Sequence, residues 1–263
     1  MTLYSALLYF YLYGFLGWCA EVAFAAARQR TFVNRGFLNG PICPIYGVGV
    51  ITVVGLLEPF QDHLILLYLM STLIVTAIEW AVGFLMEKIF HHKWWDYSDK
   101  PLNLNGYVCA QFSAIWGAAC VVILYFVHPF FAKMLSFLPI WLAWMVDIVL
   151  TLLLAADVTV TVASVLKLNK SLDKMEEITA ELSRMSEHVG NSIYENMMEG
   201  LEKQEQQRQR MEELRQKYQE LLENNSVMRR RIINAFPGMT SQRHRQEFQR
   251  IKEQLKQAGK KPK

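Results

Sequence analysis

Long apolar stretches fill the first two thirds of the chain, and apolar residues become widely spaced after them. The stretches cover residues 3–27, 42–60, 64–90, 108–132 and 138–166. A helix needs about 20 apolar residues to cross a hydrocarbon core about 30 Å thick, and each stretch approaches or exceeds that length. The pattern predicts an all-α protein whose residues 1–166 form a transmembrane helical bundle of about five spans.

Residues 167–236 have the pattern of helices in water. Leu168, Leu172 and Met175 recur at four- and three-residue intervals, so the fifth span is expected to continue as an amphipathic helix. Alternating three- and four-residue spacing between residues 211 and 232 is a short coiled-coil signature, with Asn225 at a core position where it could fix the register. The apolar residues at this spacing pack either against another part of the same chain or against a second copy of it in a dimer.

Glycines leave the path of this cytoplasmic segment open. Because Gly190-Asn191 and Gly200 interrupt it, one long rod and two helices folded back on each other are both compatible with the sequence. Phe236-Pro237-Gly238 is expected to end the helix. Residues 237–263 are then predicted to be a basic tail, mobile or associated with a surface.

Charge follows the same division. Residues 1–166 hold seven basic and nine acidic side chains, and the remainder holds twenty and fifteen. The basic excess grows from Arg229 onward, and such a segment attracts anionic lipid headgroups at roughly 1 kcal/mol per basic residue near the surface. Nucleic acid is disfavoured as a partner because no aromatic platform or zinc-ligand spacing accompanies the charge. A simply solvated tail is the alternative.

Basic residues in the connections predict the orientation. Those on one side are Arg28, Arg30, Arg35, Lys88, Lys93, Lys100, Lys167, Lys170 and Lys174. The opposite side carries only Lys133, so the positive-inside rule predicts an outside N-terminus and a cytoplasmic C-terminus. The N-terminus lacks the basic leading region of a signal peptide, so the first span is expected to remain as a transmembrane helix.

Ionisable residues inside the spans are the leading functional candidates, because each costs roughly 2.5–3.5 kcal/mol at mid-helix on insertion scales. They are Glu21, Glu79, Asp147 and Asp157. In the predicted orientation Asp147 lies nearer the outer half, and the other three lie in the cytoplasmic half. If those three converge, their repulsion favours a proton or cation site on a transport path. The alternative is that each pairs with a nearby base, Glu21 with Arg28 and Glu79 with Arg35.

The connection between the first two spans has the most specific local sequence. It reads Asn34-Arg35-Gly36-Phe37-Leu38-Asn39-Gly40-Pro41-Ile42-Cys43-Pro44-Ile45-Tyr46-Gly47. Its glycines permit a tight irregular backbone, and Pro41 and Pro44 suit a first helical turn. A helix N-terminus beside Arg35 is a candidate anion site, and the fourth span starts from the same side after Asn105-Gly106. The alternative is a tight loop that only sets the angle of the second span.

Other residue clusters predict anchoring and packing, and no cofactor. Trp94, Trp95, Asp96 and Tyr97 form a sequence typical of the headgroup boundary, where amphipathic rings accumulate. Two adjacent histidines, His91 and His92, precede them and are weak evidence for a metal, so no metal site is predicted. The four cysteines form no CxxC pair and are expected to be small packing residues.

The same residues carry a family resemblance over about residues 5 to 120. The motifs are Gly14-Phe15-Leu16-Gly17-Trp18 with Glu21, Asn34-Arg35-Gly36-Phe37-Leu38 with Gly40-Pro41 and Pro44-Ile45-Tyr46-Gly47, then Glu79, and Trp95-Asp96-Tyr97-Ser98 with Asn105-Gly106. In order and spacing they resemble the bacterial family of putative ABC-transporter type IV permeases. The resemblance implies a bacterial inner-membrane protein with a permease-type role, and it supplies neither a substrate nor a catalytic residue.

Three functional classes follow, in order of preference. The first is a permease or transporter subunit with Glu21, Glu79, Asp157 and Arg35 along its path. The chain has no G-x-x-x-x-G-K-[ST] phosphate loop, so any ATPase would be a separate subunit. Five spans are few for a complete transporter, so a homodimer or a heteromeric complex is expected. The second is a membrane scaffold or sensor, and the third is a lipid-modifying enzyme, which no nucleophile–base pair supports.

Overall fold

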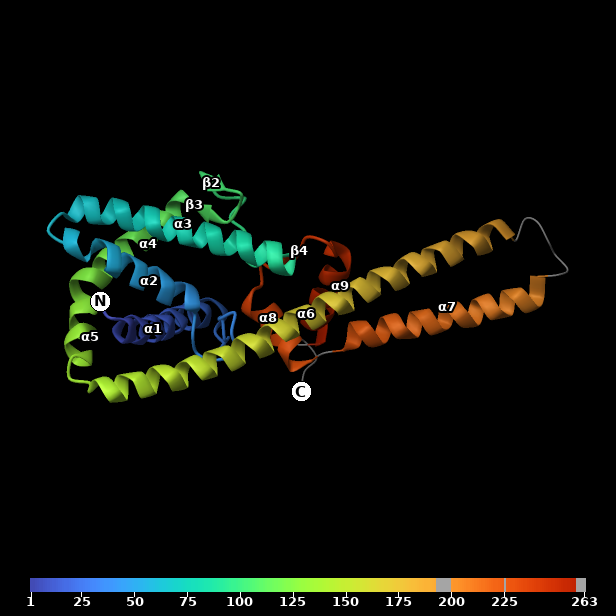
Figure 1. Cartoon of the computed structure of the whole chain (residues 1–263). Coiled ribbons are helices and arrows are strands. Elements are labelled where there is room, and N and C mark those ends of the chain that lie inside the picture. The colour runs from blue at the N-terminus through green and yellow to red at the C-terminus, as the bar shows by residue number, and fades with distance from the viewer. Residues whose placement is uncertain (193–199, 225, 259–263) are drawn as a thin grey trace. The chain divides into compact units, whose positions relative to one another are not determined.

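The computed structural model describes residues 1–192, 200–224 and 226–258 (Figure 1). Contacts within the chain divide it into two units. The first unit is Met1–Ala163 with Asn234–Met239, and the second is Ser164–Ile233 with Thr240–Lys263. The following paragraphs describe each unit by itself.

Helices make up most of the first unit. They are α1 (Leu3–Gln29), α2 (Pro44–Leu57), the 3-10 turn η1 (Glu58–Phe60), α3 (Leu64–Phe90), α4 (Ala110–Val122), the π-helical η2 (Ile123–Val127), α5 (His128–Leu135) and the first part of α6 (Ile140–Ser192). Three two-residue strands follow α3: β1 (His92–Lys93), β2 (Asn103–Leu104) and β3 (Val108–Cys109). Strands β2 and β3 pair in antiparallel fashion, with Asn103 opposite Cys109.

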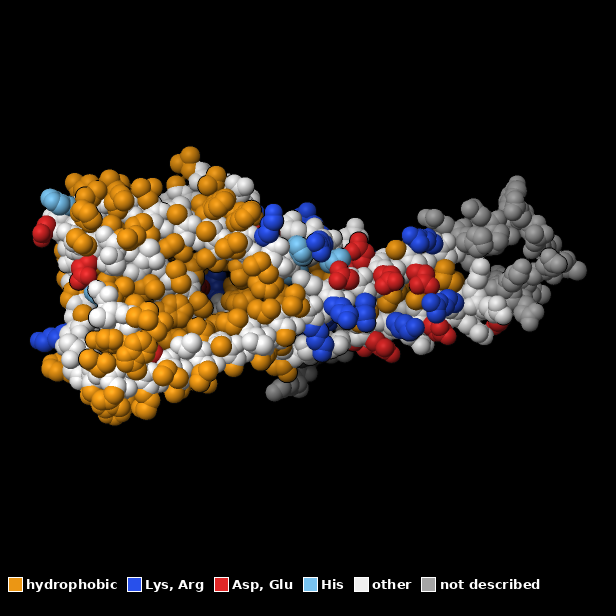
Figure 2. Space-filling view, viewed as in Figure 1, with side chains coloured by type: hydrophobic (Ala, Val, Ile, Leu, Met, Phe, Trp, Pro, Cys, Tyr) orange, Lys and Arg blue, Asp and Glu red, His pale blue; other side chains and the backbone are white. Residues whose placement is uncertain are grey.

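Among the described residues, four helical stretches are long and apolar enough to cross a membrane. They are Leu3–Gln29, Leu64–Phe90, Ala110–Leu135 and Ile140–Ser186. Large apolar side chains point outward on them, with Ile65, Leu73 and Leu152 each more than 60% exposed. Figure 2 shows this hydrophobic surface over the first unit in orange. An apolar exterior of this kind is what lipid requires, so the prediction of a multi-pass helical membrane protein is confirmed.

The second predicted span is only partly helical. A helix was expected over residues 42–60, but α2 has 14 residues, which is about 21 Å at 1.5 Å per residue. The preceding residues run back along α1 without regular structure: the Trp18 indole N–H donates to Asn34 Oδ1 at 2.7 Å, and the Cys43 N–H donates to the Gly14 carbonyl at 2.9 Å. Residues 31–57 therefore combine an irregular half with a helical half.

Successive elements of the first unit reverse direction. Helix α2 runs antiparallel to α1, because Gly17 lies against Tyr46 and Gly47 lies against Phe10. Helices α3 and α4 are also antiparallel, with Gly83 near Tyr107 and Gly117 near Thr72. Helix α6 runs in the direction of α1, since the Tyr4 ring meets Trp144 and the Tyr11 hydroxyl meets Thr151 Oγ1 at 2.7 Å. Four of the five predicted spans are thus present as long apolar helices, and the shorter helix α2 stands in place of the second.

A buried cluster holds α1, α2, α3 and α4 with η2 together. Its members are Tyr9, Tyr13, Val50, Val53, Val54, Leu57, Leu67, Cys120 and Leu124. Small residues let α1 and α2 approach closely, as is common between membrane helices. A Cβ added at Gly17 would lie 2.3 Å from Tyr46 Cγ, and one added at Gly47 would lie 2.5 Å from the Phe10 carbonyl oxygen.

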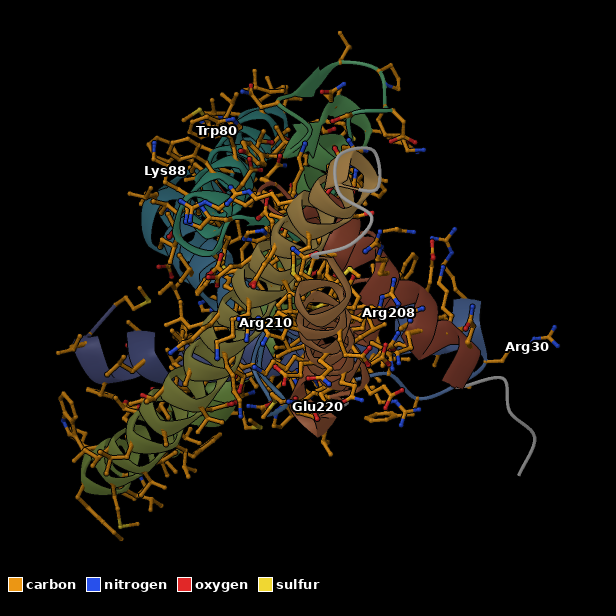
Figure 3. All side chains as sticks on the ribbon, turned by 90° about the vertical axis from the view of Figure 1, so that its right-hand side faces the viewer. Arg30, Trp80, Lys88, Arg208, Arg210 and Glu220 are labelled. Atoms are coloured by element: carbon orange, nitrogen blue, oxygen red, sulfur yellow. The ribbon has the colours of Figure 1, made fainter. Side chains whose placement is uncertain are left out.

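The second unit consists of helices with their own core. They are the remainder of α6, α7 (Gly200–Glu223), α8 (Val227–Ala235) and α9 (Arg245–Ala258), together with the two-residue strand β4 (Thr240–Ser241). The buried apolar side chains are Val165, Leu168, Leu172, Met175, Leu214, Ile232, Ile233, Phe248, Ile251 and Leu255. Arg210 on α7 pairs with Glu181 on α6 at 3.3 Å, and Figure 3 shows Arg210 and Arg208 on different sides of α7.

The second unit differs from its sequence prediction in two places. The coiled-coil stripe over residues 211–232 is not one helix, because α7 ends at Glu223 and α8 begins at Val227. Asn225, the predicted register residue, lies outside the described residues. Gly190 and Asn191, where an interruption was considered, lie within α6, and Gly200 begins α7. The tail was expected to be mobile or associated with a surface, whereas Arg245–Ala258 form a helix whose Phe248 and Ile251 are buried.

Candidate functional site

The interruption of the second pass places irregular backbone beside the middle of α1. Non-helical backbone at membrane depth persists only where protein or water satisfies its polar groups. The Asn34 side chain satisfies several of these polar groups. Its Oδ1 accepts hydrogen bonds from the Trp18 indole N–H at 2.7 Å and from the Gly36 N–H at 3.3 Å. Its Nδ2 donates to the Asn39 carbonyl at 2.7 Å. One amide side chain thus closes the loop on itself and ties it to α1.

Asp157 of α6 anchors the tip of the same loop. Its Oδ1 accepts from the Asn39 N–H at 3.0 Å and from Asn39 Nδ2 at 2.8 Å, and its Oδ2 accepts from the Gly40 N–H at 2.7 Å. Thr161 Oγ1 adds a fourth bond at 3.2 Å. Asp157 was predicted to line a path with Glu21 and Glu79, but its oxygens are occupied by the loop. Its role in the structure is to hold that loop.

Glu21 links α1 to α2 and to the loop. The Tyr46 hydroxyl donates to Glu21 Oε1 at 2.6 Å, and Arg35 Nε lies 3.4 Å from Oε2. Arg35, rather than Arg28, is therefore the base beside Glu21. The Arg35 guanidinium also lies 5.1 Å from the centre of the Phe24 ring, so it is held between an aromatic face and a carboxylate.

Glu79 of α3 has a buried carboxylate oxygen, Oε2, with no hydrogen-bond partner among the described residues. The suggested pairing with Arg35 is not present, because Arg35 pairs with Glu21. Tyr46 interacts electrostatically with both Glu21 and Glu79. The Glu79 carboxylate therefore lies near Tyr46 and has no positively charged partner among the described residues.

Tyr97, in the connection after α3, lies near the same charges. Burial raises the pKa of its hydroxyl, and the charges of Glu79 and Glu21 raise it further while Arg35 opposes them. Because a Coulomb effect falls with distance, Glu21, Glu79 and Arg35 all lie in the neighbourhood of Tyr97. Two of the three predicted carboxylates thus come together, and Asp157 has a separate role.

Aromatic rings accompany these groups. The Tyr46 ring meets Trp116 edge to face at 5.5 Å, and the Tyr97 ring stacks on Phe112 at 4.9 Å. Phe112 and Trp116 are four residues apart, so both project from one face of α4. Sequence reasoning missed this pair, and their helical spacing is the signal that could have found them. It also missed Thr161, one turn beyond Asp157 on α6.

The predicted anion site at the start of α2 is weakened by two contacts. Only Pro44 occupies the first helical turn, since α2 begins there and Pro41 lies in the loop. The Cys43 N–H is already bonded to Gly14, and Arg35 is already paired. The start of α4 is closed as well, because Cys109 before it is 1% exposed.

The connection 91–109 packs more tightly than an interfacial anchor. Trp94, expected at the headgroup boundary, is 3% exposed and meets the Phe37 ring at 5.0 Å. The Trp95 indole N–H donates to the Tyr107 carbonyl at 2.8 Å. Asp96 accepts from Ser98 and lies 2.9 Å from Lys93 Nζ. Although burial opposes ionisation, these bonds hold the pKa of Asp96 below its ordinary value.

These features define a class of protein: a multi-pass helical membrane protein with an interrupted second pass and a polar, aromatic-lined group of residues beside it. The family model described as Putative ABC-transporter type IV matches residues 8–162. The chain belongs to this family. Comparison with curated proteins and with solved structures gives no match. The matched residues include Glu21, Arg35, Glu79 and Asp157.

Proposed function

We propose that the chain is a permease or transporter subunit whose binding site is the group formed by Glu21, Arg35, Glu79 and the surrounding aromatic rings. Family membership supports a transporter-related role for the membrane part. An interrupted transmembrane pass beside a polar group is a recurrent arrangement of binding sites in transporters. Glu21 belongs to α1, Arg35 to the loop after it and Glu79 to α3, so movement of any one of these parts would alter the site.

The observation that carries the proposal is the buried Oε2 of Glu79, which has no partner among the described residues. Arg35 is engaged with Glu21, so this pair adds little net charge. When ionised, the remaining carboxylate favours a positive group that neutralises it. The rings of Tyr46, Tyr97, Phe112 and Trp116 supply aromatic faces of the kind that bind ammonium ions. The site suits a protonated amine or a zwitterion with its ammonium toward Glu79.

We further propose that the site opens to the cytoplasm. The end of α1 next to the site carries Arg28 and Arg30, and basic residues concentrate on the cytoplasmic side of membrane proteins. Under this proposal the chain lies in a bacterial inner membrane with its C-terminus inside. Because the chain has no phosphate-binding loop, ATP would be hydrolysed by a separate subunit.

Binding of small probes to the chain in lipid nanodiscs tests the charge preference. Isothermal titration calorimetry would compare choline and betaine, as cationic and zwitterionic probes, with acetate as the anionic one. Glu79→Gln should weaken choline binding about tenfold, a loss of about 1.4 kcal/mol. Asp99→Asn is the matched control, since its side chain is 76% exposed in the loop. Tighter binding of acetate than of choline would refute the assignment.

A second candidate function is a membrane scaffold or sensor acting through the second unit. The observation that favours it is the separate core of that unit, which includes Leu172, Met175 and Ile232. A cell deleted for the gene and supplied with residues 1–166 would distinguish the two. Restoration of transport by this truncated chain supports the permease, whereas complete loss despite normal insertion supports the scaffold.

A further inference from the structure

Asp147 of α6 is the most isolated carboxyl group in the membrane part of the chain. It is 1% exposed, and neither Oδ1 nor Oδ2 has a hydrogen-bond partner among the described residues. Asp157, ten residues further along the same helix, accepts four hydrogen bonds. The two aspartates therefore require different explanations: Asp157 is a structural anchor, and Asp147 is not bonded to anything that would hold it ionised.

The contacts on either side locate the Asp147 carboxyl. Trp144, one turn before it, meets the Tyr4 ring of α1 with centroids 6.3 Å apart. Thr151, one turn after it, bonds the Tyr11 hydroxyl of α1 at 2.7 Å. Residues three and four apart share one face of a helix, so Asp147 faces α1 between these two contacts.

No charge on the facing helices compensates Asp147. The titratable side chains of α1 from Tyr4 to Tyr11 are the hydroxyls of Tyr4, Tyr9 and Tyr11, and the first charged side chain of α1 is Glu21. Helix α2 has no charged residue at all. An ionised carboxylate buried without a partner in an apolar medium is strongly disfavoured, and such a group takes up a proton instead.

We propose that Asp147 is a proton-binding site in the part of the bundle near the start of α6, separate from the group around Glu79. Its ligand is a proton, held as a neutral carboxylic acid. The site lies seven residues from Ile140, about 10 Å along the helix axis from the end of α6, so a proton can reach it from that side. This inference does not depend on the proposed transport of a solute.

A hydroxyl pair lies next to the site on its inner side. Thr151 is four residues from Asp147, and either its hydroxyl or that of Tyr11 can donate in the bond between them. Because the direction of this bond can reverse, the pair can accept a proton from one side and release one to the other. The arrangement therefore gives Asp147 a polar neighbour for proton exchange.

Infrared spectroscopy of the chain in nanodiscs tests the inference directly. The C=O stretch of a neutral carboxylic acid is well separated from the bands of a carboxylate. Labelling aspartate with ¹³C at the carboxyl carbon identifies an aspartic acid band without any mutation, and it leaves a band from Glu79 unshifted. We expect one neutral aspartic acid band at pH 7, and we expect it to disappear in Asp147→Asn but not in Asp157→Asn.

Transfer to D₂O adds a second readout. A site that exchanges its proton with water shows an isotope shift of the same band within minutes, and Thr151→Val should slow this shift. Absence of a neutral aspartic acid band at pH 7 would overturn the proposal. A band that never shifts in D₂O would overturn it too, because Asp147 would then be an inert buried acid. If choline binding at Glu79 fails while this band exchanges, the proposed solute site is refuted and the proton site stands.

Discussion

The Tyr46 hydroxyl donates a 2.6 Å hydrogen bond to Glu21 Oε1, joining the first turn of α2 to α1. Beneath that bond Gly17 leaves the space that the Tyr46 ring occupies, since a Cβ there would lie 2.3 Å from Tyr46 Cγ. The interruption of the second pass depends on this close approach. A helix that starts at Pro44 packs this closely on α1 because Gly17 has no side chain and Glu21 offers a hydrogen-bond acceptor to Tyr46.

Gly17→Ala should destabilise the membrane part by about 1–3 kcal/mol, because the added methyl group overpacks the α1–α2 contact. Thermal unfolding in detergent, followed by circular dichroism, measures the effect. Gly49→Ala is the control: it lies on α2 with nothing within 4 Å of an added Cβ, and alanine favours the helix. Equal melting temperatures for the two variants would show that Gly17 is not a close-packing position.

Asp157→Asn should loosen the loop, because an amide has one acceptor oxygen where the carboxylate uses two. The backbone N–H groups of Asn39 and Gly40 would compete for that oxygen, with a cost of about 1–3 kcal/mol for the unsatisfied donor. Hydrogen exchange at residues 36–43 should accelerate. Asp62→Asn, at an exposed position, should leave those rates unchanged. Unaltered exchange in Asp157→Asn would mean that Asn34 and the other contacts of the loop hold it without Asp157.

The apolar pattern predicted the passes because lipid imposes one simple requirement on length and hydrophobicity. It did not predict the break in the second pass, since Pro41 and Pro44 are equally suited to begin a helix. The helix begins at Pro44 because Asp157 holds Asn39 and Gly40 in the loop before it, and Asp157 is more than 100 positions away in the sequence. Long-range hydrogen bonds of this kind leave no periodic signal.

The site was predicted in part for a related reason. A carboxylate within an apolar stretch is visible in a sequence, so Glu21 and Glu79 could be selected. Which base pairs with Glu21 depends on how the loop folds back, and Arg35 reaches it where the nearer Arg28 does not. The helix in the tail could also have been predicted, because Phe248, Ile251 and Leu255 have helical spacing. The basic residues around them instead favoured the prediction of a mobile segment.

The connection 91–109 should lose stability in acid through Asp96. The pKa of Asp96 is lowered in the folded chain, so its contribution is complete above the unfolded value of about 3.9 and is lost as the pH falls through the folded pKa. Chemical shifts of Ser98, followed by NMR between pH 6 and 2, should report this loss. Asp96→Asn should remove the transition, and a titration that persists in that variant would assign it to another group.

His244 should hold α9 against α6 within the second unit. Its Nε2 lies 2.7 Å from Asp173 Oδ1, and its Nδ1 lies 2.5 Å from Glu176 Oε2. Each ring nitrogen thus lies within hydrogen-bond distance of a carboxylate on α6, which ties the residue before α9 to α6 at two points. His244→Ala should therefore speed hydrogen exchange across residues 245–258, by a free energy of about 1.5–3 kcal/mol. His63→Ala, at an exposed position, is the control. Unchanged exchange would show that Phe248 and Ile251 suffice to hold the helix.

Arg35→Gln should make the proposed site more negative and therefore more attractive to cations. Arg35 Nε lies 3.4 Å from Glu21 Oε2, and among the described residues this is the one ion pair of Glu21. Without it, two carboxylates would face the aromatic rings with no counter-charge. Choline binding in nanodiscs should tighten several-fold, and the gain should shrink in high salt because screening weakens the added attraction. Arg30→Gln is the matched control: Arg30 is exposed, and Figure 3 shows it at the edge of the molecule, directed away from the helices. The opposite result, weaker choline binding in Arg35→Gln alone, would mean that Arg35 positions Glu21 for the ligand rather than neutralising it. Equal choline affinities in Arg35→Gln and Arg30→Gln would show that Arg35 and Glu21 are not part of the binding site.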